Sequence, residues 1–141
     1  MKINDYIVKY RNVDEKDYRG TPLEEHYQDG IRRFVRTPYV ICEDGFEMSV
    51  QASESHYSTP KAFSDEYTEV EIGYPSAPES LIAEYAEDWE VEGDDDPRLC
   101  NTVYGFVPVK LVDQVLKKHG GIDEDAVQAR IEEMKKEKEI A

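Results

Sequence analysis

The sequence predicts an α+β protein, with a curved antiparallel sheet from its N-terminal part packed by C-terminal helices. Apolar and polar side chains alternate in residues 46–51 and again in residues 67–74, which is typical of half-buried strands. Residues 109–119 instead repeat apolar side chains at helical spacing. Strands followed by helices favour the α+β class over an alternating α/β arrangement.

The strand assignments begin near the N-terminus. Residues 5–11 contain Tyr-Ile-Val-Lys-Tyr, which has strand propensity. Asp44-Gly45 separates two further strand patterns, and this dipeptide predicts a type I′ hairpin turn, in which both central residues have positive φ. Residues 102–107 form the last predicted strand, which Pro108 ends.

Three helices are predicted from their start and stop signals. Ser76 and Glu79 form a capping box with Pro78 in the first turn, which predicts a helix to about residue 86. Gly120 follows residues 109–119 as a left-handed cap, and Asp123 caps the last helix. The assignment is one domain over residues 1–141, with the sheet mainly in 5–74 and 102–107 and helices near 77–86, 109–119 and 123–139.

The last helix has only a thin apolar stripe, formed by Val127, Ile131 and Met134. Such a stripe is too narrow to anchor a helix on its own monomer. We therefore expect this helix either to pack against a partner subunit, in a dimer or hexamer, or to fray.

Charge restricts the kinds of partner. The chain of 141 residues has 32 acidic and 17 basic residues, a formal net charge of −15. This disfavours nucleic acid and anionic membranes, both of which need a basic footprint. It suits a cationic protein partner or a small ligand held in a locally basic pocket.

No apolar run reaches the roughly 18 residues of a membrane helix. Without a visible signal peptide, we expect a cytoplasmic protein with Cys42 and Cys100 reduced.

The sequence favours binding over catalysis. His26, His56 and His119 lack the spacing of metal ligands, and Asp94–Asp96 lacks the glycine and terminal glutamate of a calcium loop. No nucleophile motif is present. His56 and His119 are the one candidate acid–base pair. We therefore expect no enzyme activity, no metal and no cofactor.

Aromatic and cationic side chains point to a binding site. Ten tyrosines, four phenylalanines and one tryptophan suit stacking on a flat ring, and cations near loop or helix ends suit phosphate groups. Asn101 offers an amide that reads a base edge. The cations are Arg32, Arg33, Arg36, Lys61, Lys117 and Lys118.

Several segments together resemble the phage-encoded Thoeris anti-defence sponge family. Members of this family trap cyclic ADP-ribose variants and, in some cases, cyclic oligonucleotides. The resemblance spans about residues 30–122. It is carried by Ser49-Val50-Gln51-Ala52-Ser53, His56-Tyr57, Pro60-Lys61, Val70-Glu71-Ile72-Gly73-Tyr74-Pro75-Ser76, Val103-Tyr104-Gly105-Phe106-Val107-Pro108-Val109 and His119-Gly120-Gly121-Ile122.

The resemblance implies an oligomer that binds a cyclic nucleotide without cleaving it. An arginine, an aromatic residue and an asparagine hold the nucleotide in such proteins. Lys61 and Lys118 occupy positions where the family has arginine. Lysine keeps the charge but lacks the planar, bidentate contact of arginine, which puts the affinity and the choice of ligand in question. The resemblance gives the arginine role to Arg32 or Arg33, the aromatic role to Tyr85 or Tyr104 and the amide role to Asn101, and it adds Lys61 and Lys118 to the ligand-binding residues.

Two other classes of function stay open. Residues 84–96 are dense in acid, which fits an inhibitor whose carboxylates imitate DNA phosphates and block a nucleic-acid enzyme. A DNA mimic spreads acid along whole helices and strands, however, whereas the strongest acidic run here is a single predicted loop. A housekeeping or virion accessory domain is the third class.

Overall fold

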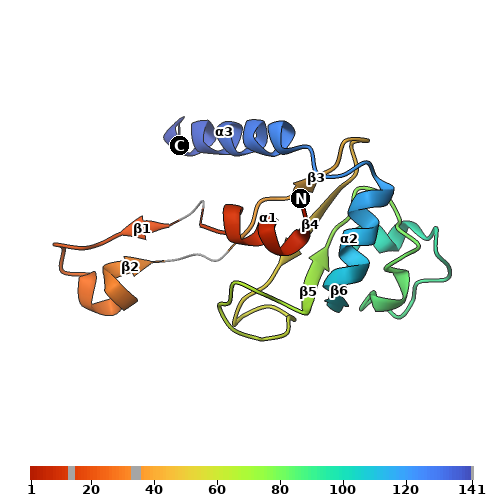
Figure 1. Ribbon diagram of the computed structural model, residues 1–141, viewed down its shortest axis with the longest axis horizontal. Helices are drawn as coiled ribbons and strands as arrows, with labels where there is room; N and C mark the ends of the chain where they lie inside the picture. Colours follow the sequence, from red (N-terminus) through yellow and green to blue (C-terminus); the bar gives the residue numbers. More distant parts are fainter. Residues whose placement is uncertain (13–14, 33–35, 141) are drawn as a thin grey trace.

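The computed structural model describes residues 1–12, 15–32 and 36–140 and has the predicted α+β architecture. Its main sheet has four strands in the order β3-β4-β5-β6, and every neighbouring pair is antiparallel (Figure 1). The strands are β3 (Val40–Ile41), β4 (Glu47–Gln51), β5 (Glu69–Gly73) and β6 (Val103–Pro108).

The N-terminal segment is helix α1 (Ile3–Tyr10), so the strand predicted in residues 5–11 is wrong. Its buried residues are Ile3, Tyr6, Ile7 and Tyr10, which follow the i, i+3, i+4, i+7 spacing of an amphipathic helix. The Asp113 carboxylate accepts a hydrogen bond from the Ile3 amide at 2.8 Å and ties α1 to helix α2. Packing of this apolar face outweighs the strand propensity of the individual residues.

Strands β3 and β4 form the predicted hairpin, with Val40 opposite Met48. The turn is not type I′, because Asp44 lacks the positive φ which that type requires. The Gly45 amide donates to the Cys42 carbonyl at 2.9 Å, and Gly45 itself takes φ 92°. The hairpin therefore needs glycine at the end of its turn rather than at a central position.

Helix α2 (Val109–Lys118) ends as predicted, but with two left-handed glycines. The Gly120 amide donates to the Lys117 carbonyl at 3.2 Å, and the Gly121 amide donates to the Leu116 carbonyl at 2.8 Å. These two bonds make a Schellman motif, which satisfies the last carbonyls of the helix.

Helix α3 (Glu124–Ile140) begins at the predicted cap, where Asp123 accepts from the Ala126 amide at 3.1 Å. Val127 is fully buried, Ile131 is partly buried against the core and Met134 is exposed. Lys9 pairs with Glu124 at 2.7 Å and Arg130 with Glu47 at 3.0 Å. The C-terminal end of α3 extends away from the sheet (Figure 1).

Residues 77–86 do not form the predicted helix. The only helical residues in this range are the short 3₁₀ turn η3 (Ala83–Tyr85), and η4 (Pro97–Asn101) follows the acidic loop. Ser76 accepts a hydrogen bond from the Glu47 amide at 2.9 Å, which ties it to β4 instead of capping a helix. The Glu79 side chain is buried and bonded to the end of α2, so it does not close a capping box.

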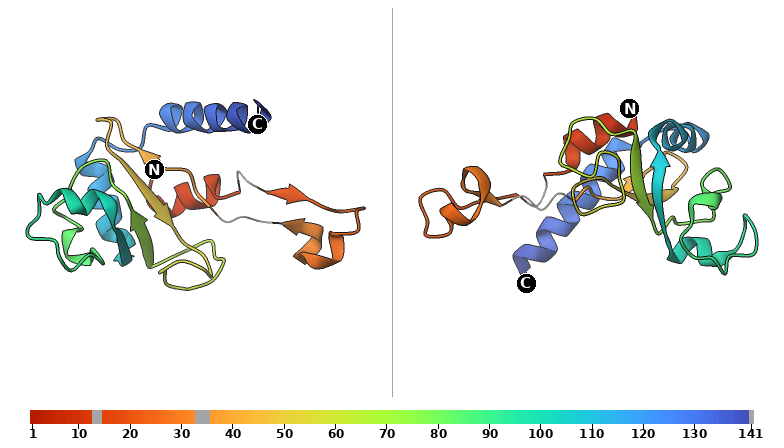
Figure 2. Two further views of the ribbon diagram at one scale, coloured as in Figure 1. Left: turned by 180° about the vertical axis from the view of Figure 1, so that it is seen from behind. Right: turned by 90° about the horizontal axis from the view of Figure 1, so that it is seen from below.

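A two-stranded ribbon projects from the body of the molecule, as the views in Figure 2 show. It pairs β1 (Lys16–Asp17) with β2 (Ile31–Arg32). Its tip holds the 3₁₀ turns η1 (Glu24–His26) and η2 (Gln28–Gly30) and a stacked Tyr18–Tyr27 pair with ring centroids 5.4 Å apart.

The core lies between the sheet and α1, α2 and the start of α3 (Figure 1). None of the described helices is long and apolar enough to cross a membrane. Among the described residues, the fully buried side chains with the largest volume are Tyr6, Tyr67, Tyr104, Ile3, Ile7, Met48, Ile72, Ile82, Leu99 and Glu79.

Candidate functional site

The predicted ligand-binding residues are spread over several parts of the fold. Arg32 is the last residue of β2 in the projecting ribbon, where it pairs with Lys16 of β1. Arg33 lies outside the described residues. Lys61 is exposed in the loop before β5, with its ammonium 5.4 Å from the centre of the Tyr57 ring.

Tyr104 and Lys118 have structural roles that the sequence did not reveal. Tyr104 is fully buried on β6, and its hydroxyl donates to the Leu99 carbonyl. Burial raises the pKa of Tyr104 to about 12. Its ring belongs to the core, so it cannot stack on a ligand. The Lys118 ammonium donates to the buried Glu79 carboxylate at 3.0 Å.

Tyr85 and Asn101 lie in the two 3₁₀ turns next to β6. Tyr85 ends η3 and packs its ring partly against the core. Asn101 ends η4 and is exposed. Neither residue lines the groove described next.

A groove of about 940 Å³ lies where the projecting ribbon meets the outer face of the main sheet. Its floor includes Ser49 and Gln51 of β4 and Glu71 of β5, which alternate with the core-facing residues of those strands. Its volume is in the range of small-molecule sites. Further lining residues are Gln28, Asp29, Ile31, Arg36, Ser53, Glu54, Ser55, His56, Phe63, Tyr74 and Val103.

Gln51 holds the segment that contains Arg36 and Thr37 against this face of the sheet. Its Oε1 accepts from the Thr37 amide at 2.9 Å, and its Nε2 donates to the Thr37 carbonyl at 2.8 Å. This pair of bonds holds Thr37 against β4, and Arg36 is the residue immediately before it. Arg36 is exposed in the groove, and no described carboxylate forms an ion pair with it.

His56 is oriented within the groove by a serine. Its Nδ1 lies 2.6 Å from the Oγ of Ser53, whose residue is only 2% exposed. Burial lowers the pKa of His56, and Arg36 acts in the same direction while Glu71 opposes it. The imidazole is therefore neutral at neutral pH. Its Nε2 has no hydrogen-bond partner in the part of the chain that the structure describes, so it is available to a ligand.

His119 does not join His56 as an acid–base pair. Its Nδ1 lies 2.6 Å from an Asp44 carboxylate oxygen and its Nε2 lies 2.8 Å from one of Glu79. Its ring stacks on Phe46 with centroids 4.0 Å apart. These contacts place His119 at the end of α2, where it links the β3–β4 turn to the buried Glu79.

Tyr74 presents its ring to the groove from a strained backbone. It follows β5 with φ 48°, and its side chain is 51% exposed. The left-handed region is unfavourable for a bulky residue, and such conformations cluster at functional sites. Strand alternation predicts that Tyr74 faces the core with Val70 and Ile72, so sequence periodicity gave no sign of this exposed ring.

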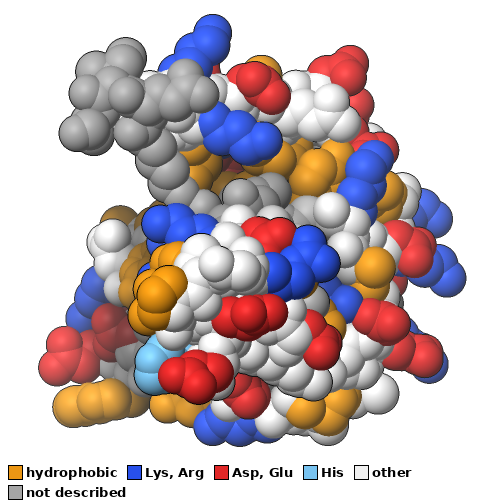
Figure 3. Space-filling view, turned by 90° about the vertical axis from the view of Figure 1, so that its left-hand side faces the viewer, with side chains coloured by type: hydrophobic (Ala, Val, Ile, Leu, Met, Phe, Trp, Pro, Cys, Tyr) orange, Lys and Arg blue, Asp and Glu red, His pale blue; other side chains and the backbone are white. Residues whose placement is uncertain are grey.

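Acidic and basic side chains are interspersed on the face toward which the ribbon points (Figure 3). The groove itself contains Asp29, Glu54 and Glu71 as well as Arg36. No group of three or more metal-ligating side chains occurs among the described residues. The described lining residues of the groove therefore combine one cation, one imidazole and an exposed phenol ring with three carboxylates.

Comparison of the chain with protein-family models, with curated proteins and with solved structures gave no match.

Proposed function

We propose that this protein binds a small anionic ligand with a flat ring, of the cyclic nucleotide class, in the groove and holds it without cleaving it. The observation that carries the proposal is the combination of Arg36 and the strained, exposed Tyr74 in one groove. A guanidinium binds phosphate with charged hydrogen bonds, and a phenol ring stacks on a base.

An imidazole and a second aromatic ring in the groove support this use of it. His56 offers a free imidazole nitrogen for a base edge or a ribose hydroxyl, and Phe63 provides a second aromatic surface. The Arg11 guanidinium lies 3.9 Å from the centre of the Phe63 ring and stabilises its position. In the sequence, Arg33 lies between the lining residues Ile31 and Arg36.

Binding without cleavage rests on the surroundings of Ser53. Its hydroxyl accepts the Ser55 amide at 3.1 Å in addition to contacting His56, so it is engaged in a local turn. A serine nucleophile needs an exposed hydroxyl beside its base. Ser53 is buried and therefore acts as a positioning residue for His56.

Retention of intact ligand tests the proposal. The protein is incubated with cyclic ADP-ribose isomers and cyclic dinucleotides, freed of unbound ligand by filtration and then heat-denatured, and the supernatant is analysed by chromatography. We expect one class to be retained in proportion to protein and recovered unchanged. Retention of none, or appearance of a cleaved product, contradicts the proposal.

Arg36→Ala identifies the groove as the site. A charged hydrogen bond contributes about 1.5–3 kcal/mol, so its loss should weaken binding roughly tenfold to a hundredfold in calorimetry. Lys110→Ala is the matched control, because it removes one exposed cation from α2, outside the groove. Equal effects of the two substitutions would show that only the overall charge matters.

The resemblance to the Thoeris anti-defence sponges supports the same activity in an infected bacterium. A sequestering protein lowers the free concentration of the immune signal without consuming it. Co-expression with a defence system that signals through a cyclic nucleotide should restore phage plaques, and the Arg36→Ala variant should not restore them.

A further inference from the structure

Three exposed aromatic side chains lie along the edge strand β6 and the segment of residues 86–89 that runs antiparallel beside its start. Tyr57, Phe106 and Trp89 are 42%, 44% and 88% exposed, and we call them the aromatic patch. The rings of Tyr57 and Phe106 form a pair with centroids 5.8 Å apart. The position that a Cβ on Gly105 would occupy lies 3.4 Å from both the Glu87 carboxylate and the Tyr57 Cβ. Trp89 follows Glu87 by two residues, at most about 7 Å along the chain.

Phe106 is exposed through an unfavourable backbone conformation. Its φ is 54°, in the left-handed region that bulky residues rarely adopt. Its amide donates to the Tyr57 carbonyl at 3.1 Å, which holds this conformation in place. The register of β5 and β6 shifts between the Val70–Val107 and Ile72–Tyr104 pairs, and this β-bulge accounts for the conformation and turns the apolar ring outward into water.

The loop that carries Trp89 is braced by its own hydrogen bonds. The Asp88 amide donates to the Thr102 hydroxyl at 3.2 Å, and the Glu90 amide donates to the Asp88 carboxylate at 2.9 Å. Arg98 lies 3.9 Å from the Glu90 carboxylate on the far side of the loop. The indole is therefore presented on a fixed loop, which lowers the entropy lost on binding.

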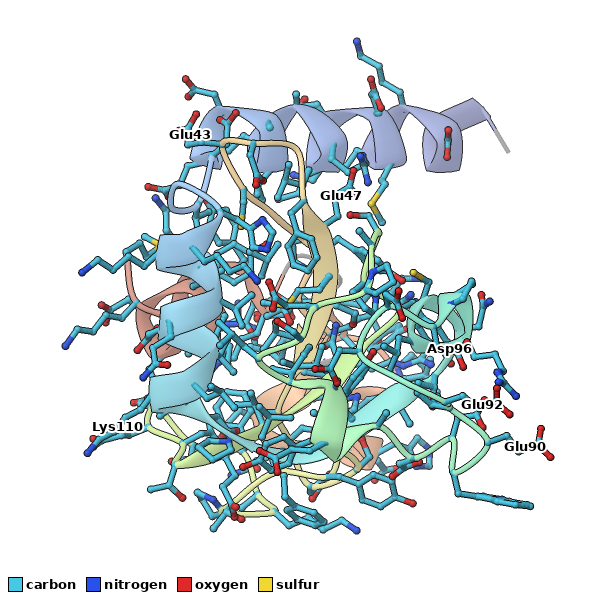
Figure 4. All side chains as sticks on the ribbon, turned by 90° about the vertical axis from the view of Figure 1, so that its right-hand side faces the viewer. Glu43, Glu47, Glu90, Glu92, Asp96 and Lys110 are labelled. Atoms are coloured by element: carbon cyan, nitrogen blue, oxygen red, sulfur yellow. The ribbon has the colours of Figure 1, made fainter. Side chains whose placement is uncertain are left out.

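The charge around the patch indicates the kind of partner. Residues 84–98 contain eight acidic residues and one base, Arg98. Figure 4 shows Glu90 and Glu92 on the outer side of this loop, whereas the Asp96 side chain is only 10% exposed and pairs with Arg98 at 2.8 Å. The same loop is equally acidic in a second copy of this chain, so two aromatic patches repel each other.

We propose that the aromatic patch docks onto another protein whose contact surface has an apolar pocket ringed by lysine and arginine. Trp89 enters the pocket, and the carboxylates of residues 84–96 face the surrounding cations. Exposed tryptophans that become buried are characteristic hot spots of protein interfaces. This inference is independent of the groove and of its ligand.

Trp89 is the only tryptophan in the chain, so its fluorescence reports this surface directly. The free protein should show the red-shifted emission of a solvated indole and full access to iodide. Three helical peptides of equal length serve as probes: one of lysine and leucine, one of lysine and serine, and one of glutamate and leucine. We expect the Lys/Leu peptide to shift the emission to the blue, to protect the indole from iodide and to bind at least tenfold more tightly than the other two.

Matched variants assign the binding to the patch. Trp89→Ala should weaken binding of the Lys/Leu peptide at least tenfold, as measured by the anisotropy of a labelled peptide. Leu23 is an exposed apolar residue of the ribbon, so Leu23→Ala should leave this binding unchanged. Glu87→Gln with Glu90→Gln should weaken it more than Glu132→Gln with Glu133→Gln, which removes the same two charges from α3.

Three results would overturn the proposal. The first is blue-shifted emission from the free protein at dilution, which would mean that the indole is already buried in the monomer. The second is equal affinity of the protein for the Lys/Leu and Lys/Ser peptides, or equal affinity of the original chain and the Trp89→Ala variant for the Lys/Leu peptide. Either result would mean that binding depends on non-specific charge alone. The third is protection of Trp89 that appears with rising protein concentration alone, which would make a second copy the occupant.

Discussion

Glu79 is a buried carboxylate whose removal should destabilise the fold measurably. It is 1% exposed and accepts hydrogen bonds from the Leu81 amide at 2.9 Å, from Lys118 at 3.0 Å and from His119 at 2.8 Å. The other ring nitrogen of His119 lies 2.6 Å from an Asp44 carboxylate oxygen, so the ring links the two carboxylates. The network joins residues 79–81, the end of α2 and the β3–β4 turn.

The magnitude follows from these contacts. Glu79→Gln keeps the shape and one acceptor oxygen but removes the charge. The bond to the mostly buried His119 contributes about 1.5–3 kcal/mol, whereas the Lys118 side chain is 48% exposed, so its pair contributes about 0–1 kcal/mol. We therefore expect the free energy of unfolding to fall by about 1.5–4 kcal/mol, or roughly 5–14 °C in Tm for a chain of this length.

Urea unfolding followed by far-UV circular dichroism checks this value, since the exposed Trp89 is a poor fluorescence probe of unfolding. Glu84→Gln is the control, because it removes one charge from an exposed position five residues away. A difference between the two variants below about 0.5 kcal/mol would refute the reasoning, since surface substitutions commonly stay within that range.

The pH dependence gives a second check on Glu79. Burial raises its pKa, but the Leu81 amide, Lys118 and His119 together outweigh this and leave the pKa below its ordinary value of 4.5. A lowered carboxylate pKa stabilises the fold above the unfolded-state value, and this stability is lost as the pH falls through the folded-state value. The penalty of Glu79→Gln should therefore be complete at pH 7 and shrink below about pH 4.5.

Four further predictions follow from single residues. Tyr74→Gly should leave the free energy of unfolding within about 1 kcal/mol, because it relieves a positive φ while removing an exposed ring, yet it should abolish retention of the nucleotide in the filtration assay. Gly121→Ala should cost about 1–2 kcal/mol in urea unfolding, because φ is 88° although the space is open. Ellman's reagent should label Cys100 first and Cys42 only after unfolding, because burial raises the pKa of Cys42 to about 11. We expect a dimer or larger homo-oligomer with the exposed Met134 in its interface, and Met134→Glu should lower the mass found by light scattering.

The parts of the fold that depend on local signals could be predicted from the sequence. The β3–β4 hairpin, α2 and the Asp123 cap are each specified by residues within a few positions of one another. The strand predicted in residues 5–11 is wrong because the tyrosines and β-branched residues of α1 have strand propensity, whereas their helical spacing shows only over eight residues. The helix predicted in residues 77–86 failed because long-range contacts engage both of its capping residues.

The groove could not be predicted, because it combines distant segments. Arg36 is one of several cations that the sequence offers near loop or helix ends, and its position in the groove depends on the hydrogen bonds between Thr37 and Gln51. The resemblance implies that Tyr104 stacks on a ligand, yet a tyrosine inside the apolar strand of residues 103–107 is equally typical of a core position, and the structure buries it. Tyr74 shows the reverse error, since a positive φ that sequence does not reveal turns its ring outward.

The groove and the aromatic patch both include residues of the loop that contains His56 and Tyr57. Substitutions in this loop therefore cannot test one surface separately from the other. His56 faces the groove, whereas the next residue, Tyr57, belongs to the patch. The Tyr57 amide donates to Glu71 of the groove at 2.8 Å, and its carbonyl accepts from Phe106 at 3.1 Å. A change at Tyr57 or Glu71 therefore disturbs both surfaces, and a loss of either activity in such a variant is ambiguous. Arg36 and Trp89 each belong to one surface alone, so Arg36→Ala should leave peptide binding intact and Trp89→Ala should leave nucleotide retention intact.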